Sequence, residues 1–224
     1  MTADSGKNAL GDTEGREPEE FWENLYREHR ENRALWGTRA NPLLVEVAQC
    51  LPVGTALDLG CGTGGDALWL ARRGWRVTAV DISATAVEQT RRVAQEAGLG
   101  DLVTAEQHDL AHSFPEGGFD LVSAQYLHTP FELPRSAVLR AAAQALNPGG
   151  RLLVVDHASV APWSWNQDPE THFPTPEEIH AGLELPTATW GVERAQRPRR
   201  EATGPQGQTA TVTDHVLLIR RTPQ

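Results

Sequence analysis

The stretch Ala56–Leu70, ALDLGCGTGGDALWL, decides the fold of this chain. An apolar run up to Leu59 is typical of a buried strand, glycines follow at positions 60, 62, 64 and 65, and apolar residues return at helical spacing as far as Leu70. The order strand, glycine turn, helix is the front of a βαβ unit. Glycine lets the backbone bend with positive φ and has no Cβ to hold a ligand away. The stretch therefore predicts a loop with a cofactor lying against it.

The glycines alone leave the identity of the cofactor open. Gly60, Gly62 and Gly65 satisfy the dinucleotide pattern G-x-G-x-x-G, and Asp81 closes the next predicted strand about 20 residues further on, where that pattern places a ribose ligand. A phosphate-binding P-loop is excluded, because no lysine follows the glycines. Asp58 precedes Gly60 by two residues and favours a cofactor with an amino group, since a carboxylate attracts an ammonium and repels a pyrophosphate.

The segment Asp58-Leu59-Gly60-Cys61-Gly62-Thr63-Gly64 resembles motif I of the class I S-adenosylmethionine-dependent methyltransferases. The resemblance is closest to the small stand-alone enzymes of the tellurite-resistance and thiopurine type. It implies S-adenosylmethionine as the cofactor, with Asp81 on the ribose hydroxyls, Ile82 on the adenine ring and Asp109 on the adenine amine. The cofactor-binding residues that we expect are Asp58, Gly60, Cys61, Gly62, Gly64, Asp81, Ile82, Asp109, Leu110 and Gln125.

Predicted strands and helices alternate along the chain behind the glycine turn. The strands span residues 75–81, 103–107, 119–128 and 151–155, the helices between them span 84–97 and 137–146, and an Asn-Pro-Gly-Gly turn at 147–150 introduces the fifth strand. This alternation predicts an α/β fold, a doubly wound, seven-stranded, mostly parallel Rossmann-like sheet with ligands at the carboxyl ends of its strands. Segments 191–203 and 209–221 flank a Gly-Pro-Gln-Gly turn and predict an antiparallel C-terminal hairpin.

The remaining segments predict one domain with additions around it. Residues 1–20 carry acidic residues, Gly and Ser without an apolar period, which predicts a disordered acidic tail. We expect residues 21–224 to form a single methyltransferase domain. Helices at 21–35 and 43–50 would make residues 21–50 an N-terminal helical lid, or else pack on the sheet. Residues 157–185 would form a substrate-side loop and helix, with Thr175 as the helix cap and Pro176 at its first position.

Composition limits the partners and the compartment. A chain of 224 residues fits one domain, and its net charge of -10 argues against a broad nucleic-acid surface. No segment has the pattern of a signal peptide or the length of a membrane span, so we expect neither nucleic acid nor a membrane as partner. The cysteines, Cys50 and Cys61, indicate a reduced cytoplasm, and Cys61 is expected to fill the tight loop rather than act as a nucleophile. The sequence leaves the oligomeric state open between monomer and homodimer.

Methyl transfer from a sulfonium is an in-line displacement, which requires the acceptor and the methyl group to be held close and collinear with water excluded. We expect a small-molecule acceptor that takes the methyl group on nitrogen, oxygen, sulfur or another chalcogen. A base is needed only when the acceptor is protonated at neutral pH. His128, at the end of the predicted fourth strand, is either that base or a polar residue of the cofactor pocket. Asp156 and His157, at the end of the fifth strand, are a second pair of candidate catalytic residues.

Large side chains near the predicted pocket are candidates for acceptor binding or for ordinary loop packing: Trp36, Arg39, Tyr126, Trp163 and Trp165. No metal is expected among these candidate residues. Two alternative functions remain. A nicotinamide-dependent oxidoreductase shares the glycines and Asp81, but Lys7 is the only lysine, so a Tyr-x-x-x-Lys catalytic set is absent. A non-catalytic S-adenosylmethionine-binding protein would keep the cofactor site alone.

Overall fold

The computed structural model describes residues 15–32, 39–164, 167–168, 170–204 and 206–223. In chain order its elements are α1 (Pro18–Asn32), α2 (Pro42–Ala48), β1 (Thr55–Leu59), α3 (Gly65–Arg72), β2 (Arg76–Asp81), α4 (Ala84–Glu96), β3 (Val103–Gln107), β4 (Phe119–Gln125), α5 (Arg135–Gln144), β5 (Leu146–His157), α6 (Pro176–Leu183), β6 (Trp190–Gln196), β7 (Arg199–Thr203) and β8 (Thr209–Arg221). Among the described residues, no helix combines the length and the apolar character that crossing a membrane requires.

The strands form one sheet that is parallel over its first part. β1 to β5 pair in parallel in the order β3-β2-β1-β4-β5, and β8 pairs antiparallel to β5. β6 and β7 both pair antiparallel to β8. The predicted doubly wound sheet with an antiparallel C-terminal hairpin is confirmed. The winding direction reverses between β1 and β4, which is the place where open α/β sheets bind ligands.

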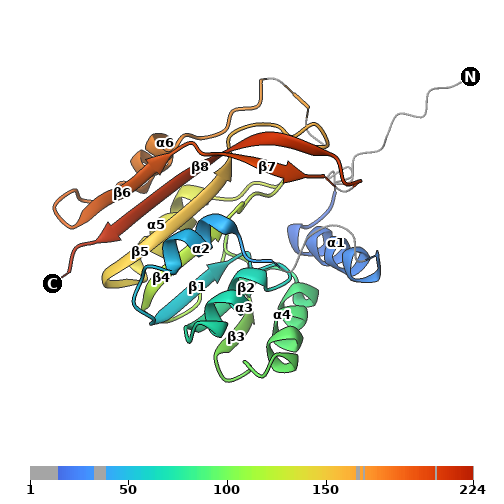
Figure 1. The fold of residues 1–224 in the computed structure, drawn as a ribbon, viewed down its shortest axis with the longest axis horizontal. Coiled ribbons are helices and arrows are strands. Elements are labelled where there is room, and N and C mark those ends of the chain that lie inside the picture. The colour runs from blue at the N-terminus through green and yellow to red at the C-terminus, as the bar shows by residue number, and fades with distance from the viewer. Residues whose placement is uncertain (1–14, 33–38, 165–166, 169, 205, 224) are drawn as a thin grey trace, which may run out of the picture.

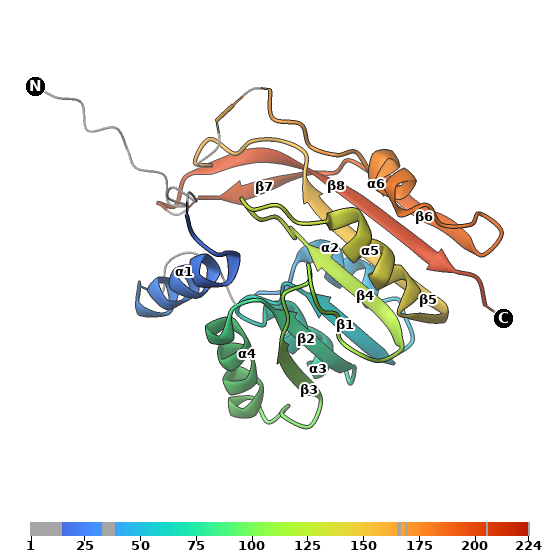
Figure 2. The same cartoon turned by 180° about the vertical axis from the view of Figure 1, so that it is seen from behind.

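Helices cover both faces of this sheet. Figure 1 shows α2 and α3 in front of it, and Figure 2, seen from behind, shows α5 and α6 across the other face. Each face has an apolar core, with Leu44 and Leu70 in the first and Leu139 and Leu183 in the second. A parallel strand buried on both faces needs apolar side chains at successive positions, as in the run Leu152–Val155 of β5. The two cores fix the strand ends that carry the site.

The C-terminal hairpin differs from the prediction in the number of its strands. The sequence predicts one strand over 191–203, whereas the structure has β6 and β7 there, so the sheet has eight strands rather than seven. Pro198 lies in the break. Proline has no N–H for a strand ladder, and the carbonyl of Pro198 accepts the backbone N–H of Asp214 at 3.0 Å. Both views place the turn between β7 and β8 above α1 (Figures 1 and 2).

Two predicted boundaries around the fourth and fifth strands are wrong. β4 ends at Gln125 rather than His128, because Tyr126 has a φ of 51° and turns the chain out of the sheet. β5 begins at Leu146, so the turn predicted at 147–150 lies inside the strand, where Gly149 has a φ of 86° and the pairing with β4 shifts in register. His128 consequently lies in the loop that follows β4.

The other boundaries differ from the predictions by a few residues at most, which is the usual uncertainty of helix and strand ends. α1 begins at Pro18, inside the range predicted as a tail, and residues 33–35 of the predicted helix lie outside the described residues. β3 spans the predicted residues. The predicted start of α6 is also observed: Thr175 and Glu178 form a capping box, with Pro176 in the first turn.

Candidate active site

The glycine turn between β1 and α3 adopts a conformation that only glycine takes without strain. Gly60, Gly62 and Gly64 have φ values of 71°, 52° and 82°. The backbone N–H groups of Gly60 and Cys61 both donate to the carbonyl of Val80 at 2.9 Å, which fixes the turn to the end of β2. A Cβ on Gly64 would lie 2.9 Å from the Thr90 hydroxyl oxygen, so the turn has no room for a side chain there.

Two buried oxygens beside this turn lack hydrogen-bond partners among the described residues. They are Oδ2 of Asp58, which is 2% exposed, and Oε1 of Gln125, whose amide nitrogen donates to Ser123 at 2.7 Å. Burial and the charges of Asp66 and Asp81 raise the pKa of Asp58 well above its ordinary value. Asp58 pairs in register with Ser123, so both oxygens belong to one face of the sheet. Two unsatisfied acceptors fit a donor-rich cation such as an ammonium group.

Asp81 lies at the end of β2 with 5% of its surface exposed. Its Oδ2 accepts the N–H of Gly62 and its Oδ1 accepts the N–H of Ser83, each at 3.0 Å. The N–H of Ile82 and the hydroxyl of Tyr26 donate to the same carboxylate. Burial raises the pKa of Asp81 to about 6, and these hydrogen bonds limit the rise. The position fits the predicted ribose contact, and the carboxylate is already surrounded by donors.

Asp109 follows β3 and uses its carboxylate within its own turn. Oδ1 accepts the backbone N–H of Ala111 at 2.9 Å, and Oδ2 lies 2.9 Å from Nδ1 of His112. Asp109 and its neighbour Leu110 nevertheless line the same pocket as Asp81 and Ile82. The adenine contact of Asp109 therefore stays a prediction, with local partners already in place.

His128 lies against a fully buried carboxylate at the other end of the site. Its Nε2 is 3.2 Å from Oδ1 of Asp156, a residue that is 0% exposed. Nη2 of Arg135 donates to both oxygens of this carboxylate, at 2.8 Å to Oδ1 and 2.5 Å to Oδ2. Burial works to raise the pKa of Asp156, but the hydrogen bond with His128 and the charge of Arg135 outweigh it and hold the pKa below its usual value. Asp156 is thus an anion that orients the imidazole. Sequence analysis missed Arg135, because the first residue of a crossover helix carries no motif.

His157 belongs to a second polar group at the end of β5. Its ring stacks on Tyr126 at 4.3 Å between centroids, and its Nδ1 is 3.9 Å from Oδ1 of Asp214. The Tyr126 hydroxyl donates to Asp214 Oδ2 at 3.0 Å, and Nε of Arg200 donates to the same oxygen at 2.6 Å. The rings of His128 and His157 lie 5.9 Å apart and nearly parallel. Asp214 and Arg200 were absent from the sequence prediction, since each lies in a strand with no neighbouring motif.

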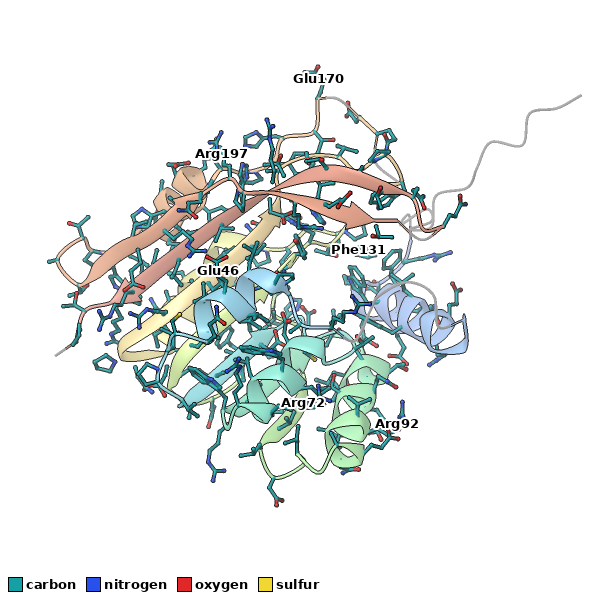
Figure 3. All side chains as sticks on the ribbon, in the orientation of Figure 1. Glu46, Arg72, Arg92, Phe131, Glu170 and Arg197 are labelled. Carbon is teal, nitrogen blue, oxygen red and sulfur yellow. The ribbon has the colours of Figure 1, made fainter. Side chains whose placement is uncertain are left out.

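One pocket joins the glycine turn to His128. Trp22 and Tyr26 of α1 form part of its wall, and the end of β4 with the loop that follows it, over residues 125–133, forms another part. Phe131 of this loop makes an edge-on contact with Phe21 of α1 at 5.3 Å, and Figure 3 shows Phe131 beside that helix. The sequence marks this helix face as apolar but does not separate its core residues from those that line a pocket.

The predicted cofactor residues divide into two groups. Gly60, Asp81, Ile82, Asp109, Leu110 and Gln125 line the pocket. Asp58, Cys61, Gly62 and Gly64 do not belong to its lining. Cys61 is 7% exposed, its Sγ lies 3.6 Å from the Thr90 hydroxyl, and burial raises the pKa of the thiol, as expected for a residue that fills a tight loop.

The predicted acceptor-binding and catalytic residues are only partly brought together. Tyr126 and His128 line the pocket, whereas Arg39 and His157 do not. Trp163 packs on the turn between β7 and β8, where a Cβ on Gly204 would lie 2.6 Å from its indole ring. Trp36 and Trp165 lie outside the described residues. Within the described part of the chain, no group of three or more potential ligands is placed to hold a metal ion.

Comparison with known proteins finds similarity to methyltransferases. Residues 56–150 match the family described as "Methyltransferase domain". The "Methyltransferase GfsG" of Streptomyces halstedii is 36% identical over 104 residues, which are 45% of this chain and 36% of that protein. The "Ribosomal RNA small subunit methyltransferase C" of Chromohalobacter salexigens is 36% identical over 137 residues, 59% of this chain and 40% of that protein. The aligned part thus spans well under half of these relatives.

A solved structure extends the likeness to nearly the whole fold. The protein described under "Conversion of a Disulfide Bond into a Thioacetal Group during Echinomycin Biosynthesis" superposes with a TM-score of 0.71 and 26% identity, over 91% of this chain and 92% of that one. The fold, the glycine turn and the family match together make this chain similar to the class I S-adenosylmethionine-dependent methyltransferases. Residues 56–150 are the part of the chain that matches this family, and S-adenosylmethionine is the cofactor of the class that the chain resembles.

Proposed function

We propose that this chain transfers the methyl group of S-adenosylmethionine to a nitrogen, oxygen, sulfur or other chalcogen atom of a small molecule by in-line displacement. The observation that carries the proposal is one pocket with two differently equipped ends. The glycine turn and Asp81 lie at the first end, and His128 on its buried partner Asp156 lies at the second. A base and a cofactor site in one pocket are what methylation of a protonated acceptor needs.

The cofactor fits the residues at the first end. When bound, it supplies a methyl group already activated on a sulfonium. Asp58 and Gln125, with their unsatisfied oxygens, would hold its ammonium group, and Asp81 would hold its ribose. Ile82 and Leu110, which line the pocket, would cover its adenine.

At the second end, His128 would take the proton of the acceptor. Because Asp156 accepts from Nε2, the neutral ring carries its free lone pair on Nδ1, and Nδ1 is the atom that would receive the proton. Arg135 compensates the charge of Asp156 and keeps that carboxylate in place. Asp156 and Arg135 are positioning residues in this proposal, and His128 is the catalytic one. An acceptor that is already anionic, such as a thiolate, would bypass His128.

A small-molecule acceptor is favoured over RNA by charge. One relative bears the name of a ribosomal RNA methyltransferase, but the net charge of this chain is -10, and RNA binding rests on phosphate contacts with many basic side chains. A soluble compound that enters the pocket needs no such surface.

The test is release of S-adenosylhomocysteine from S-adenosylmethionine in the presence of thiophenol, selenite, catechol and benzylamine in turn. Turnover of at least one of them is expected. With a protonated acceptor, His128→Gln should lower kcat by about 100-fold or more while leaving the affinity for S-adenosylhomocysteine unchanged. A parallel fall in cofactor affinity would instead make His128 a pocket residue.

The two alternative functions are separated by the same preparation. Binding of S-adenosylhomocysteine without transfer to any acceptor would favour a non-catalytic cofactor-binding protein. Binding of a nicotinamide dinucleotide in place of S-adenosylhomocysteine would favour the oxidoreductase, which shares Asp81 and the glycines but not the family match over residues 56–150.

A further inference from the structure

Tyr26 occupies part of the site that the cofactor needs. It lies on α1, lines the pocket, and donates its hydroxyl hydrogen bond to Asp81. Its hydroxyl oxygen also lies 3.1 Å from the point where a Cβ on Gly62 would stand. The phenol therefore reaches the space next to the glycine turn, beside the carboxylate to which a ribose would bind.

The carboxylate of Asp81 has no capacity left for a ribose. A carboxylate offers about four acceptor positions. Asp81 receives the backbone N–H groups of Gly62, Ile82 and Ser83 and the hydroxyl of Tyr26. A ribose brings two hydroxyl donors. The backbone donors are fixed by the glycine turn and the end of β2, whereas Tyr26 comes from a separate helix, so Tyr26 is the donor that can leave.

Glu23 holds α1, and with it Tyr26, in this position. Oε2 of Glu23 accepts the Ser83 hydroxyl at 2.7 Å and the Thr85 N–H at 2.9 Å, and Oε1 accepts the Thr85 hydroxyl at 2.5 Å. These groups form the N-terminus of α4, where a negative charge is stabilised by the helix dipole. Although burial opposes it, this hydrogen bonding lowers the pKa of Glu23 to about 2, so the contact is charged at neutral pH.

The same helix touches the loop at the acceptor end. Nε1 of Trp22 donates to the Thr129 hydroxyl at 3.3 Å, and Phe21 packs on Phe131. Movement of α1 away from Asp81 would therefore disturb the loop that carries His128.

We infer that the Tyr26 hydroxyl takes the place of a ribose hydroxyl on Asp81, that Glu23 holds it there, and that the cofactor binds by displacing it. The inference rests on the proposed cofactor and adds residues that no motif contains. It makes Tyr26 a determinant of cofactor affinity, acting against binding rather than for it. It also links cofactor occupancy to the acceptor-side loop through α1.

The experiment is calorimetric titration of the full chain and of Tyr26→Phe with S-adenosylhomocysteine and with 2′,3′-dideoxyadenosine. The variant keeps the ring and loses the competing hydrogen bond to a carboxylate, so it should bind S-adenosylhomocysteine about tenfold more tightly. Dideoxyadenosine lacks the ribose hydroxyls, does not compete for Asp81, and should bind both proteins equally. Unchanged or weaker binding of S-adenosylhomocysteine to Tyr26→Phe would overturn the inference, the weaker case making Tyr26 a direct cofactor ligand.

A second pair of variants tests the latch. Glu23→Gln weakens the contact with α4 and should raise the association rate of S-adenosylhomocysteine, whereas Glu28→Gln, at an exposed position of the same helix, should not. Equal rates in the two variants would remove Glu23 from the inference. If the unaltered chain did not bind S-adenosylhomocysteine at all, the proposed cofactor itself would be overturned. If it bound S-adenosylhomocysteine and Tyr26→Phe bound it no more tightly, only the inference about Tyr26 would be overturned.

Discussion

The two ends of the pocket are built in different ways. At the cofactor end, Asp58, Gly60 and Gly62 come from one short stretch, and Asp81 ends the adjacent strand. At the acceptor end, the Tyr126 hydroxyl reaches Asp214, 88 positions further along the chain. The cofactor end can be predicted from local sequence, because a turn of this kind needs glycines at fixed positions along the chain. The second depends on which strands the fold brings side by side.

The largest effect is expected at the cofactor end. Gly62→Val should abolish binding of S-adenosylhomocysteine in calorimetry, because a side chain at a φ of 52° is strained and would fill the space beside Asp81 that the Tyr26 hydroxyl now reaches and that the cofactor needs. Gly98→Val is the matched control, since Gly98 has a φ of 70° with nothing within 4 Å of its Cβ position. It should cost stability but not affinity. Equal affinities of the Gly62 and Gly98 variants would remove the turn from the site.

The next effect tests the acceptor end as a buried charge cluster. Arg135→Met should lower the free energy of unfolding by about 3 kcal/mol, since Asp156 loses its cation inside the fold. Arg92, labelled in Figure 3, pairs with Glu96 at 2.6 Å on the exposed side of α4, and Arg92→Met should cost about 0.5 kcal/mol or less. Denaturant unfolding measures both. Similar losses of unfolding free energy in the two variants would mean that the ion pair between Arg135 and Asp156 stabilises the fold little.

This contrast also explains how much the sequence could predict. The parallel sheet, the glycine turn and Asp81 follow from periodicity and from one motif, because neighbouring residues decide them. His128 and Asp156 were expected at the strand ends, but their contact with each other was not, since it arises only when Tyr126 turns the chain out of β4. The wall formed by Trp22 and Tyr26 could not be predicted, because an apolar helix face looks the same over a core and over a pocket.

The errors in the strand boundaries have local physical causes. Asn147-Pro148-Gly149-Gly150 has the composition of a turn, yet β5 passes through it, because the shift in pairing with β4 accommodates the positive φ of Gly149. Pro198 interrupts the last hairpin by lacking an N–H, a signal that was present in the sequence. Trp163 was expected near the pocket because its segment is rich in tryptophan, but its ring packs on the turn at Gly204. The amino-acid composition of a loop does not show where its side chains pack.

A smaller effect concerns the folding stability of the protein. The raised pKa of Asp58 means that its carboxyl group binds a proton more tightly in the folded protein than in the unfolded chain. The free energy of unfolding therefore falls as the pH rises from the ordinary pKa of aspartate through the pKa of Asp58 in the folded protein. Asp58→Asn removes this loss and should raise the free energy of unfolding at neutral pH by about 1–3 kcal/mol.

Asp120→Asn is the control of opposite sign. Despite its partial burial, hydrogen bonds from Thr55 and Asn147 hold the pKa of Asp120 below its usual value, so that carboxylate stabilises the fold above the ordinary aspartate range and loses this effect as the pH falls. Its substitution should lower the melting temperature at neutral pH. If Asp58→Asn also lowered the melting temperature, the idea that the Asp58 carboxylate destabilises the fold would be contradicted.

The most direct test of the account is whether Asp58 is left unsatisfied in order to receive an ammonium group. The measurement is calorimetric titration of the unaltered chain and of Asp58→Asn with S-adenosylhomocysteine and with 5′-methylthioadenosine, which lacks the amino-acid part. We predict that the unaltered chain binds S-adenosylhomocysteine at least tenfold more tightly than 5′-methylthioadenosine, and that Asp58→Asn loses this preference while keeping its affinity for 5′-methylthioadenosine. An undiminished preference in Asp58→Asn would contradict the account.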